Sequence, residues 1–227
     1  MENNESVIRY SSVDIDFEKN ILSNVNLDIK KGEFVYLIGK TGSGKSSLLK
    51  SIYADIRIDV GSAYVCGFTL NGLKKSKIPL LRRKLGIIFQ DFQLLKDRSV
   101  YDNLAFVLKA TGWKDKKAMN ERILQALDDV GLLMKANEQA CDLSEGEMQR
   151  VSIARAIVNQ PELILADEPT GALDTKTGEK VLDVLRFVHE SINATLIIVT
   201  HDRDVARLAE RTIEIRDGQV INDYYNR

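Results

Sequence analysis

The sequence predicts an α/β fold with parallel strands in its central sheet. Three observations carry this prediction. An apolar run at residues 34–38 leads into a glycine-rich loop and then a helix. A second apolar run, at 163–166, ends in the carboxylates Asp167 and Glu168. A helical pattern at 99–133 separates the two runs, so we expect a helical insert within the sheet-forming core.

Composition limits the classes of function. The chain has 227 residues, enough for one large α/β domain or two closely packed ones, and 44% hydrophobic and 29% charged residues are ordinary for a globular protein. A net charge of −1 gives no general attraction to nucleic acid, so we expect no nucleic-acid partner. The two cysteines suit a reducing compartment. No signal peptide and no apolar run of about 20 residues is visible, so we expect another chain to supply any membrane spans.

The loop from Gly39 to Ser46 has the spacing G-x-x-x-x-G-K-[ST] of a phosphate-binding loop. Glycines let the backbone turn its N–H groups toward phosphate oxygens, and the following helix adds its positive end. Lys45 is expected to reach the β- and γ-phosphates of the nucleotide, and the Ser46 hydroxyl to ligate Mg²⁺. The residues predicted to bind nucleotide here are Gly39, Lys40, Thr41, Gly42, Ser43, Gly44, Lys45, Ser46 and Ser47.

Antiparallel strands are expected around the loop. Residues 7–10 and 22–29 read as strands, and apolar residues alternate with polar ones in the second, as in a sheet with one wet face. Residues 61–70 predict a further antiparallel piece that ends at the turn Asn71-Gly72. Phe17, between the first two strands, is either core filler or an aromatic that stacks on a nucleobase.

A basic run follows this turn. It has two interpretations: a solvated helix face, which is the ordinary case, or a surface for anionic lipid headgroups or an acidic partner. The run consists of Lys74, Lys75 and Lys77, then Arg82, Arg83 and Lys84.

The second half of the chain supplies acid–base groups at predicted strand ends. Asp167 would hold Mg²⁺, and Glu168 would polarise the attacking water as general base. We expect their strand to lie beside the phosphate loop. A buried strand at 194–200 is followed by His201, at the end of the sheet where such folds bind ligands. Gln90 stands at the end of the strand predicted at 85–89, and 213–221 predicts a closing hairpin.

One further motif points to a family. Leu143-Ser144-Glu145-Gly146-Glu147 precedes a helix and resembles the L-S-x-G-[QE] signature of ABC-type ATPases. Together with the phosphate loop, Gln90, Asp167-Glu168, Ala172-Leu173-Asp174 and His201, in that family's order, the set resembles an ABC nucleotide-binding domain from end to end. Glu145 is a departure, because many members have Gly there.

The resemblance implies a fold and a division of the chain. The fold is a P-loop NTPase (RecA-like) core with a small antiparallel β subdomain and an inserted α-helical subdomain. All of 1–227 would be one ABC ATPase domain, with 1–90 and 160–227 as the core and 91–159 as the helical subdomain that carries the signature.

The resemblance also implies residue roles. Phe17 would stack on adenine, and Gln90 would sense Mg²⁺ and the γ-phosphate. Ser144 and Gly146 would contact ATP held by the opposite subunit of a head-to-tail homodimer. Asp174 would lie at the dimer interface, and His201 would help hold the γ-phosphate and water.

Within the family, residues 79–91 and 94–103 resemble the FtsE-type cell-division ATPases. That likeness implies a bacterial dimer on the cytoplasmic face of the inner membrane, bound to a polytopic partner of the FtsX type and acting on cell-wall hydrolases. The alternative is the ATPase subunit of a lipoprotein-release or macrolide-type exporter, since Ala166–Gly171 is shared with these. Phe92, Leu94 and Leu95 either pack inside the helical insert or line a groove for a coupling helix of the partner.

Other classes fit less well. A chromosome or DNA-repair ATPase needs a long coiled coil between Gln90 and the signature, and about fifty residues without sustained heptads intervene. A cofactor-assembly ATPase without a membrane subunit stays open. Intact Lys45, Glu168 and His201 argue against a nucleotide-binding module without catalysis.

Overall fold

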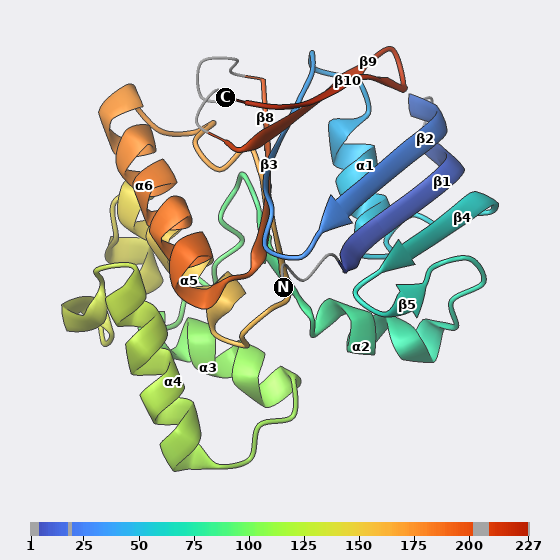
Figure 1. Ribbon diagram of the computed structural model, residues 1–227. Coiled ribbons are helices and arrows are strands. Elements are labelled where there is room, and N and C mark those ends of the chain that lie inside the picture. Colours follow the sequence, from blue (N-terminus) through green and yellow to red (C-terminus); the bar gives the residue numbers. More distant parts are fainter. Residues whose placement is uncertain (1–4, 18–19, 202–208, 227) are drawn as a thin grey trace.

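The computed structural model of the chain describes residues 5–17, 20–201 and 209–226. Within these residues the main sheet has six strands in the order β10-β9-β3-β8-β7-β6 (Figure 1). All neighbouring pairs are parallel except β9 and β10, which form the predicted closing hairpin. The strands are β3 (Phe34–Ile38), β6 (Leu85–Ile88), β7 (Leu163–Asp167), β8 (Thr195–Thr200), β9 (Arg211–Arg216) and β10 (Gln219–Tyr225).

A four-stranded antiparallel sheet lies beside it, in the order β2-β1-β4-β5. The strands predicted at 7–10 and 22–29 are confirmed and are longer than expected. Val25, Leu27 and Ile29 are buried while Asn26 and Asp28 are exposed, which is the alternation that the sequence shows. The four strands are β1 (Ser6–Phe17), β2 (Asn20–Lys30), β4 (Val60–Val65) and β5 (Phe68–Thr69).

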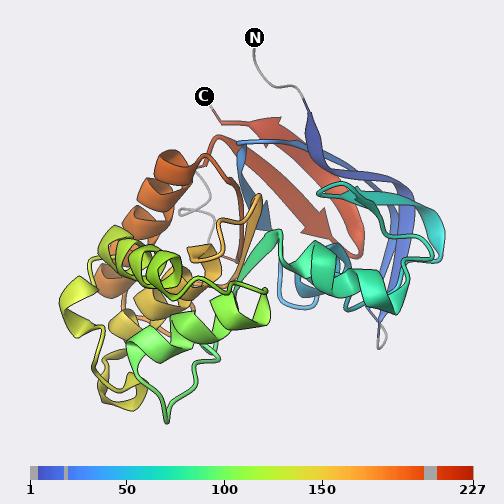
Figure 2. The same cartoon turned by 90° about the horizontal axis from the view of Figure 1, so that it is seen from below.

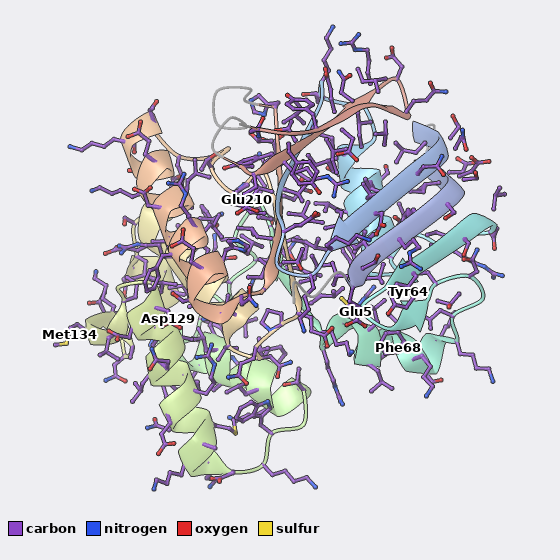
Figure 3. The ribbon with its side chains drawn as sticks, viewed as in Figure 1. Glu5, Tyr64, Phe68, Asp129, Met134 and Glu210 are labelled. Carbon is purple, nitrogen blue, oxygen red and sulfur yellow. The ribbon has the colours of Figure 1, made fainter. Side chains whose placement is uncertain are left out.

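Helices cover the main sheet on both faces, with α1 on the side of the antiparallel sheet and α3 to α6 on the other (Figure 1). The predicted helical insert is confirmed: Ser99 caps α3 and Asp115 caps α4 through their side-chain oxygens. Met134 projects from the outer corner of this helical layer (Figure 3). The helices are α1 (Lys45–Ile52), α2 (Ile78–Arg82), α3 (Val100–Ala110), α4 (Lys116–Asp129), α5 (Glu145–Ile157) and α6 (Thr175–Ile192), with 3₁₀ turns η1 (Lys75–Lys77), η2 (Leu133–Lys135) and η3 (Ala140–Asp142).

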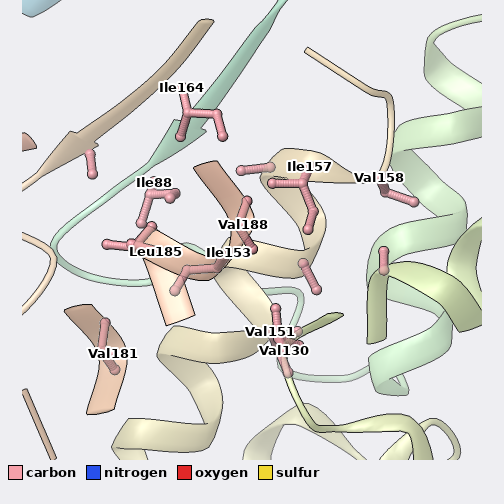
Figure 4. Close-up of a cluster of buried hydrophobic side chains, with 14 of the residues drawn as sticks. Ile88, Val130, Val151, Ile153, Ile157, Val158, Ile164, Val181, Leu185 and Val188 are labelled. Atoms are coloured by element: carbon pink, nitrogen blue, oxygen red, sulfur yellow. The ribbon is translucent and has the colours of Figure 1, made fainter. Parts of the chain in front are cut away.

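The two faces of β3 divide the hydrophobic core. Successive strand residues point to opposite faces, so Phe34, Tyr36 and Ile38 pack with the helices α3 to α6, whereas Val35 and Leu37 pack with α1 and the antiparallel sheet. Figure 4 shows the helical side, where strand residues meet valines and isoleucines of α5 and α6. Burial on both faces explains why the central strands are continuous apolar runs.

The strand that carries Asp167 ends beside the phosphate loop, as expected, since Asp167 Oδ1 lies 3.5 Å from the Ser46 hydroxyl. Within the sheet, β7 is not adjacent to β3, because β8 stands between them. The chain leaves β7 through α6 and returns to an adjacent parallel position, the usual βαβ crossover. The fully buried β8 thereby occupies the place beside β3. No helix in the described part of the chain is both long and apolar enough to cross a bilayer.

Candidate functional site

The glycine-rich loop begins where β3 ends and is held by close backbone packing. A Cβ at Gly39 would lie 2.3 Å from the Ile215 carbonyl oxygen of β9, so no other residue fits there. Gly44 caps α1 with φ 104°, a left-handed conformation that favours glycine, and a Cβ on it would lie 2.8 Å from the Leu22 side chain. The sheet and the antiparallel strands therefore fix the loop before any ligand is present.

Lys45 lies inside this loop and is nearly buried, with 6% of its surface exposed. Its Nζ donates to the Gly39 carbonyl at 2.8 Å and to the Lys40 carbonyl at 3.1 Å. An ammonium has three donors, so one remains for an anion. Burial lowers the pKa of Lys45, and the nearby carboxylates Glu168 and Asp167 oppose that shift.

The buried hydroxyl of Ser43 supports the assignment of an anion site. Ser43 Oγ has no hydrogen-bond partner among the residues that the structure describes. Buried polar atoms are seldom left unpaired in folded proteins. A phosphate oxygen is the kind of partner that this position lacks, so the loop residues fit a nucleotide phosphate.

The two carboxylates reach the loop across the end of β8. Asp167 closes β7, and the Ser46 hydroxyl donates to Asp167 Oδ1 at 3.5 Å. Burial raises the pKa of Asp167, the Ser46 hydrogen bond lowers it, and the charge of Glu168 raises it further. A hydroxyl and a carboxylate side by side are oxygen donors of the kind that Mg²⁺ takes together with substrate phosphates. The residues present therefore fit this ion.

Glu168 is held in an uncommon backbone conformation. Its φ is 48°, in the left-handed region, and its N–H donates to the Val199 carbonyl at 3.0 Å. Strain of this kind gathers at functional positions. His201 follows β8, and its Nδ1 lies 2.8 Å from Glu168 Oε2. With its ring proton on Nδ1, His201 donates to Glu168 Oε2, which leaves Glu168 Oε1 and the second ring nitrogen for other partners.

These groups surround a cavity of about 330 Å³. Gly171 also lines it and was not predicted: a Cβ there would lie 3.1 Å from Gln90 Nε2, so the glycine permits Gln90 to approach. The sequence feature that could have pointed to Gly171 is its position three residues after Glu168. Gly39 and Lys40 shape the loop without lining the cavity, the buried Ser43 hydroxyl would have to turn toward the cavity to meet a phosphate, and the Phe17 side chain lies outside the described part. The cavity is lined by Thr41, Gly42, Gly44, Lys45, Ser46, Ser47, Gln90, Asp167, Glu168, Gly171 and His201.

The remaining predicted residues lie elsewhere. Ser144, Gly146 and Asp174 line a second cavity of about 650 Å³ between the first turns of α5 and α6. Ser144 caps α5 and Asp174 caps α6, where its Oδ1 accepts from the Thr177 N–H at 3.1 Å. A Cβ at Gly146 would lie 2.5 Å from Thr177 Cγ2, so glycine lets the two helix ends meet. One chain therefore does not bring these residues to the phosphate loop.

At the second cavity, the Glu147 side chain already occupies the hydrogen-bond donors of Ser144, the residue that caps α5. The Ser144 hydroxyl donates to Glu147 Oε2 at 2.8 Å, and the Ser144 N–H donates to the same oxygen at 3.0 Å. Lys135 Nζ lies 2.8 Å from the other oxygen, Oε1. These contacts, with Lys135 first, lower the pKa of Glu147 to about 2. A phosphate at this helix end would have to compete with Glu147 for Ser144.

Comparison with known proteins agrees with this arrangement. A family profile described as ABC transporter matches residues 22–171. The "Cell division ATP-binding protein FtsE" of Streptococcus pneumoniae serotype 2 is 39% identical over 203 residues, covering 89% of this chain and 87% of the relative. The "Macrolide export ATP-binding/permease protein MacB" of Psychrobacter arcticus is 45% identical over 207 residues, 91% of this chain but 31% of the relative.

A solved structure is similar over nearly the whole chain. It is MJ0796, described as a dimeric bacterial ABC transporter cassette, with a TM-score of 0.85, 38% identity, and coverage of 97% of this chain and 99% of that one. The same cassette is also known as a dimer in a post-hydrolysis state bound to ADP and Pi.

Proposed function

The chain belongs to the ABC transporter family, and from this premise we propose that two copies of it form a head-to-tail homodimer that binds ATP between them and drives a membrane partner. The family, the fold class and the assignment as an ATPase are confirmed. The observation that carries the dimer is the separation of the two cavities. Ser144 and Gly146 lie apart from Lys45 within one chain, so a second copy would have to supply them. The dimeric state of the similar cassette MJ0796 supports this proposal.

We assign the residues of the phosphate-loop cavity as follows. Lys45 and the loop N–H groups hold the β- and γ-phosphates. Glu168 accepts a proton from the attacking water, and His201 orients the Glu168 carboxylate through the 2.8 Å contact. Ser46, Asp167 and Gln90 would hold Mg²⁺, which would supply positive charge to the phosphates. Phe17 would stack on adenine. Ser144, Gly146 and Asp174 of the second copy close the site.

A groove on another face suits the membrane partner. A cavity of about 320 Å³ runs along the edge strand β6 and the helices α3 and α5. Leu95 lines it together with Phe106, of which 51% is exposed, whereas Leu94 packs into the core. The buried Asn103 fixes Leu95 by accepting from its N–H at 2.8 Å and donating to its carbonyl at 3.1 Å.

Leu95 thus lines the groove, whereas Leu94 packs against the core, so of these two leucines only Leu95 is placed to meet a coupling helix of the partner. Arg155 of α5 ties the same segment down by donating to the Phe92 and Gln93 carbonyls. Because this segment follows Gln90 directly, movement at the nucleotide would reach the groove. An apolar groove of this kind suits an amphipathic helix.

We propose that the partner is a polytopic protein of the FtsX type and that the ATPase works at the cytoplasmic face of the bacterial inner membrane. The complex would regulate cell-wall hydrolases during cell division. The similarity to FtsE proteins supports this role. The similarity to MacB proteins supports the alternative, an exporter of the macrolide or lipoprotein-release type. Identifying the membrane protein that co-purifies with the chain distinguishes the two.

The test of the groove is Leu95→Glu. A buried leucine contributes about 1.5–3 kcal/mol, so we expect recruitment to partner-containing membranes to fall at least tenfold, with nucleotide affinity and melting temperature unchanged. Leu133→Glu is the matched control, since Leu133 is an exposed leucine on η2 outside the groove. Unchanged co-sedimentation of a folded Leu95→Glu protein would contradict the groove assignment.

A further inference from the structure

A concentrated run of positive charge lies outside both cavities described above. The basic segment, residues 74–84, holds six Lys and Arg residues and no Asp or Glu, whereas the whole chain has a net charge of −1. Its cations are Lys74, Lys75, Lys77, Arg82, Arg83 and Lys84. Such a run in a nearly neutral chain creates a local positive field.

Most of these charges have no acidic partner. Lys84 pairs with Glu162 at 2.9 Å, and Arg82 lies 3.4 Å from Asp55. The exposed side chains of Lys74, Lys75, Lys77 and Arg83 form no ion pair with the part of the chain that the structure describes. The second interpretation left open by the sequence, an anionic partner, therefore has four unneutralised cations available to it.

The segment has an apolar side as well as charge. It forms η1 and α2, and the fully buried Leu81 anchors α2 to the protein. Lys77 and Arg83 are the residues that flank α2 at its two ends, and Leu80 and Arg83, at an interval of three, lie away from the side that Leu81 buries. Leu80 is 39% exposed. A leucine flanked by cations is the pattern of helices that lie in the headgroup region of a membrane.

The basic segment borders the proposed partner groove. Arg82 lines the groove together with residues of β6 and α3. Asn159, another groove residue, donates from Nδ2 to the Arg83 carbonyl at 2.8 Å. In the view from below, α2 lies between the antiparallel sheet and the helical layer that contains α3 (Figure 2). A membrane protein in the groove would therefore bring the bilayer surface near α2.

We propose that the basic segment binds the anionic lipid headgroups of the bilayer that surrounds the partner, with Lys74, Lys75, Lys77 and Arg83 as the contacting cations and Leu80 inserted between them. The orientation of the basic segment toward the bilayer rests on the proposed function, because a membrane protein bound in the groove would turn this face of the chain to the membrane. The basic segment therefore adds an electrostatic contact with the bilayer to the attachment that the groove provides. Each cation near an anionic surface contributes about fivefold in partitioning.

The experiment uses the full chain and vesicles that contain no protein, so it does not depend on the partner. The wild type is expected to co-sediment with vesicles that contain about one-third phosphatidylglycerol, to stay in solution with pure phosphatidylcholine, and to be released by high salt. Lys74→Ala/Lys75→Ala/Lys77→Ala should lower the partition coefficient roughly a hundredfold. ATPase activity should not change, because these lysines lie outside both nucleotide cavities.

Lys114→Ala/Lys116→Ala/Lys117→Ala is the matched control. It also removes three exposed lysines within four residues, but Asp115 lies among them and Lys117 faces Glu121. Equal losses in both triple variants, or no vesicle binding by the wild type, would overturn the proposal. Loss of recruitment only when the membrane protein is present would indicate an acidic segment of that protein and would also overturn it. Leu95→Glu should bind the vesicles normally, so failure of the groove assignment and failure of lipid binding give different results.

Discussion

The two halves of the proposed nucleotide site differ in what holds their functional groups. In the phosphate-loop half, the loop follows the fully buried β3, and Lys45 is nearly buried and bonded to the backbone of its own loop. In the signature half, Ser144 and Asp174 stand at exposed helix ends and use their side chains as caps. The first half is formed by the core of the sheet, and the second by local contacts on the surface.

This difference indicates separate tasks. The phosphate-loop half has an unpaired buried hydroxyl at Ser43 and a spare donor on Lys45, so it can bind phosphates without giving up existing contacts. The signature half has its Ser144 hydroxyl already engaged by Glu147. The affinity of the single chain for nucleotide should therefore come from the first half. The signature half would contribute to ATP hydrolysis only after a second copy of the chain docks.

The largest expected effect is on hydrolysis in the first half. Glu168→Gln removes the proton acceptor while Lys45 and the loop are retained, so we expect turnover to fall by about 10²–10⁴-fold. Nucleotide affinity should be kept, and ATP should trap the dimer. Glu162→Gln, at the opposite end of the same strand, is the control for an amide in place of a carboxylate. Wild-type turnover in Glu168→Gln would contradict the assignment of the general base.

The next effect tests whether the halves come from different chains. Lys45→Ala and Ser144→Arg should each be nearly inactive alone. A heterodimer of the two has one site with both defects and one with neither, so an equal mixture should regain about a quarter of wild-type turnover. Turnover of the mixture at several ratios is the measurement. If no ratio restores activity, the head-to-tail arrangement is wrong, whereas activity in either variant alone would place all essential groups in one chain.

The phosphate-loop half was predictable because its signals are local. Gly39 to Ser47 are contiguous, and the strand before them and the helix after them can be recognised from periodicity. The carboxylates Asp167 and Glu168 follow another recognisable strand. The order of strands was not predictable in this way, since β8 enters between β3 and β7 through packing of α6 rather than through any local pattern.

The signature half was only partly predictable. The spacing of Ser144 and Glu147 is that of a capping box, which the structure shows. Lys135 lies twelve positions before Glu147 and reaches it only because η2 lies near α5. No spacing in the sequence could therefore predict this ion pair. The same holds for Leu94 and Leu95, adjacent residues that the fold sends to the core and to the groove.

The smallest expected effect concerns the stability that Glu147 gives to the capped N-terminus of α5 in the signature half. Glu147→Gln removes the charge that faces Lys135, so we expect a loss of about 0.2–1 kcal/mol in the free energy of unfolding at pH 7, the usual range for an exposed pair. The pKa of Glu147 is lowered from 4.5 to about 2 in the folded chain. The stabilisation is therefore fully present above the unfolded pKa and is lost as the pH falls from there toward 2.

Urea unfolding at several pH values should show the wild type converging on Glu147→Gln as the solution becomes more acidic. Glu145→Gln is the control, because Glu145 lies in the same first turn of α5 and has no ion pair among the residues that the structure describes. Its difference from the wild type should be smaller at pH 7. Equal stability of Glu147→Gln and wild type at pH 7 would mean that Lys135 and Glu147 do not hold the helix end. Ser144 would then be as ready for phosphate as Lys45, and the proposed contrast between the two halves would fail.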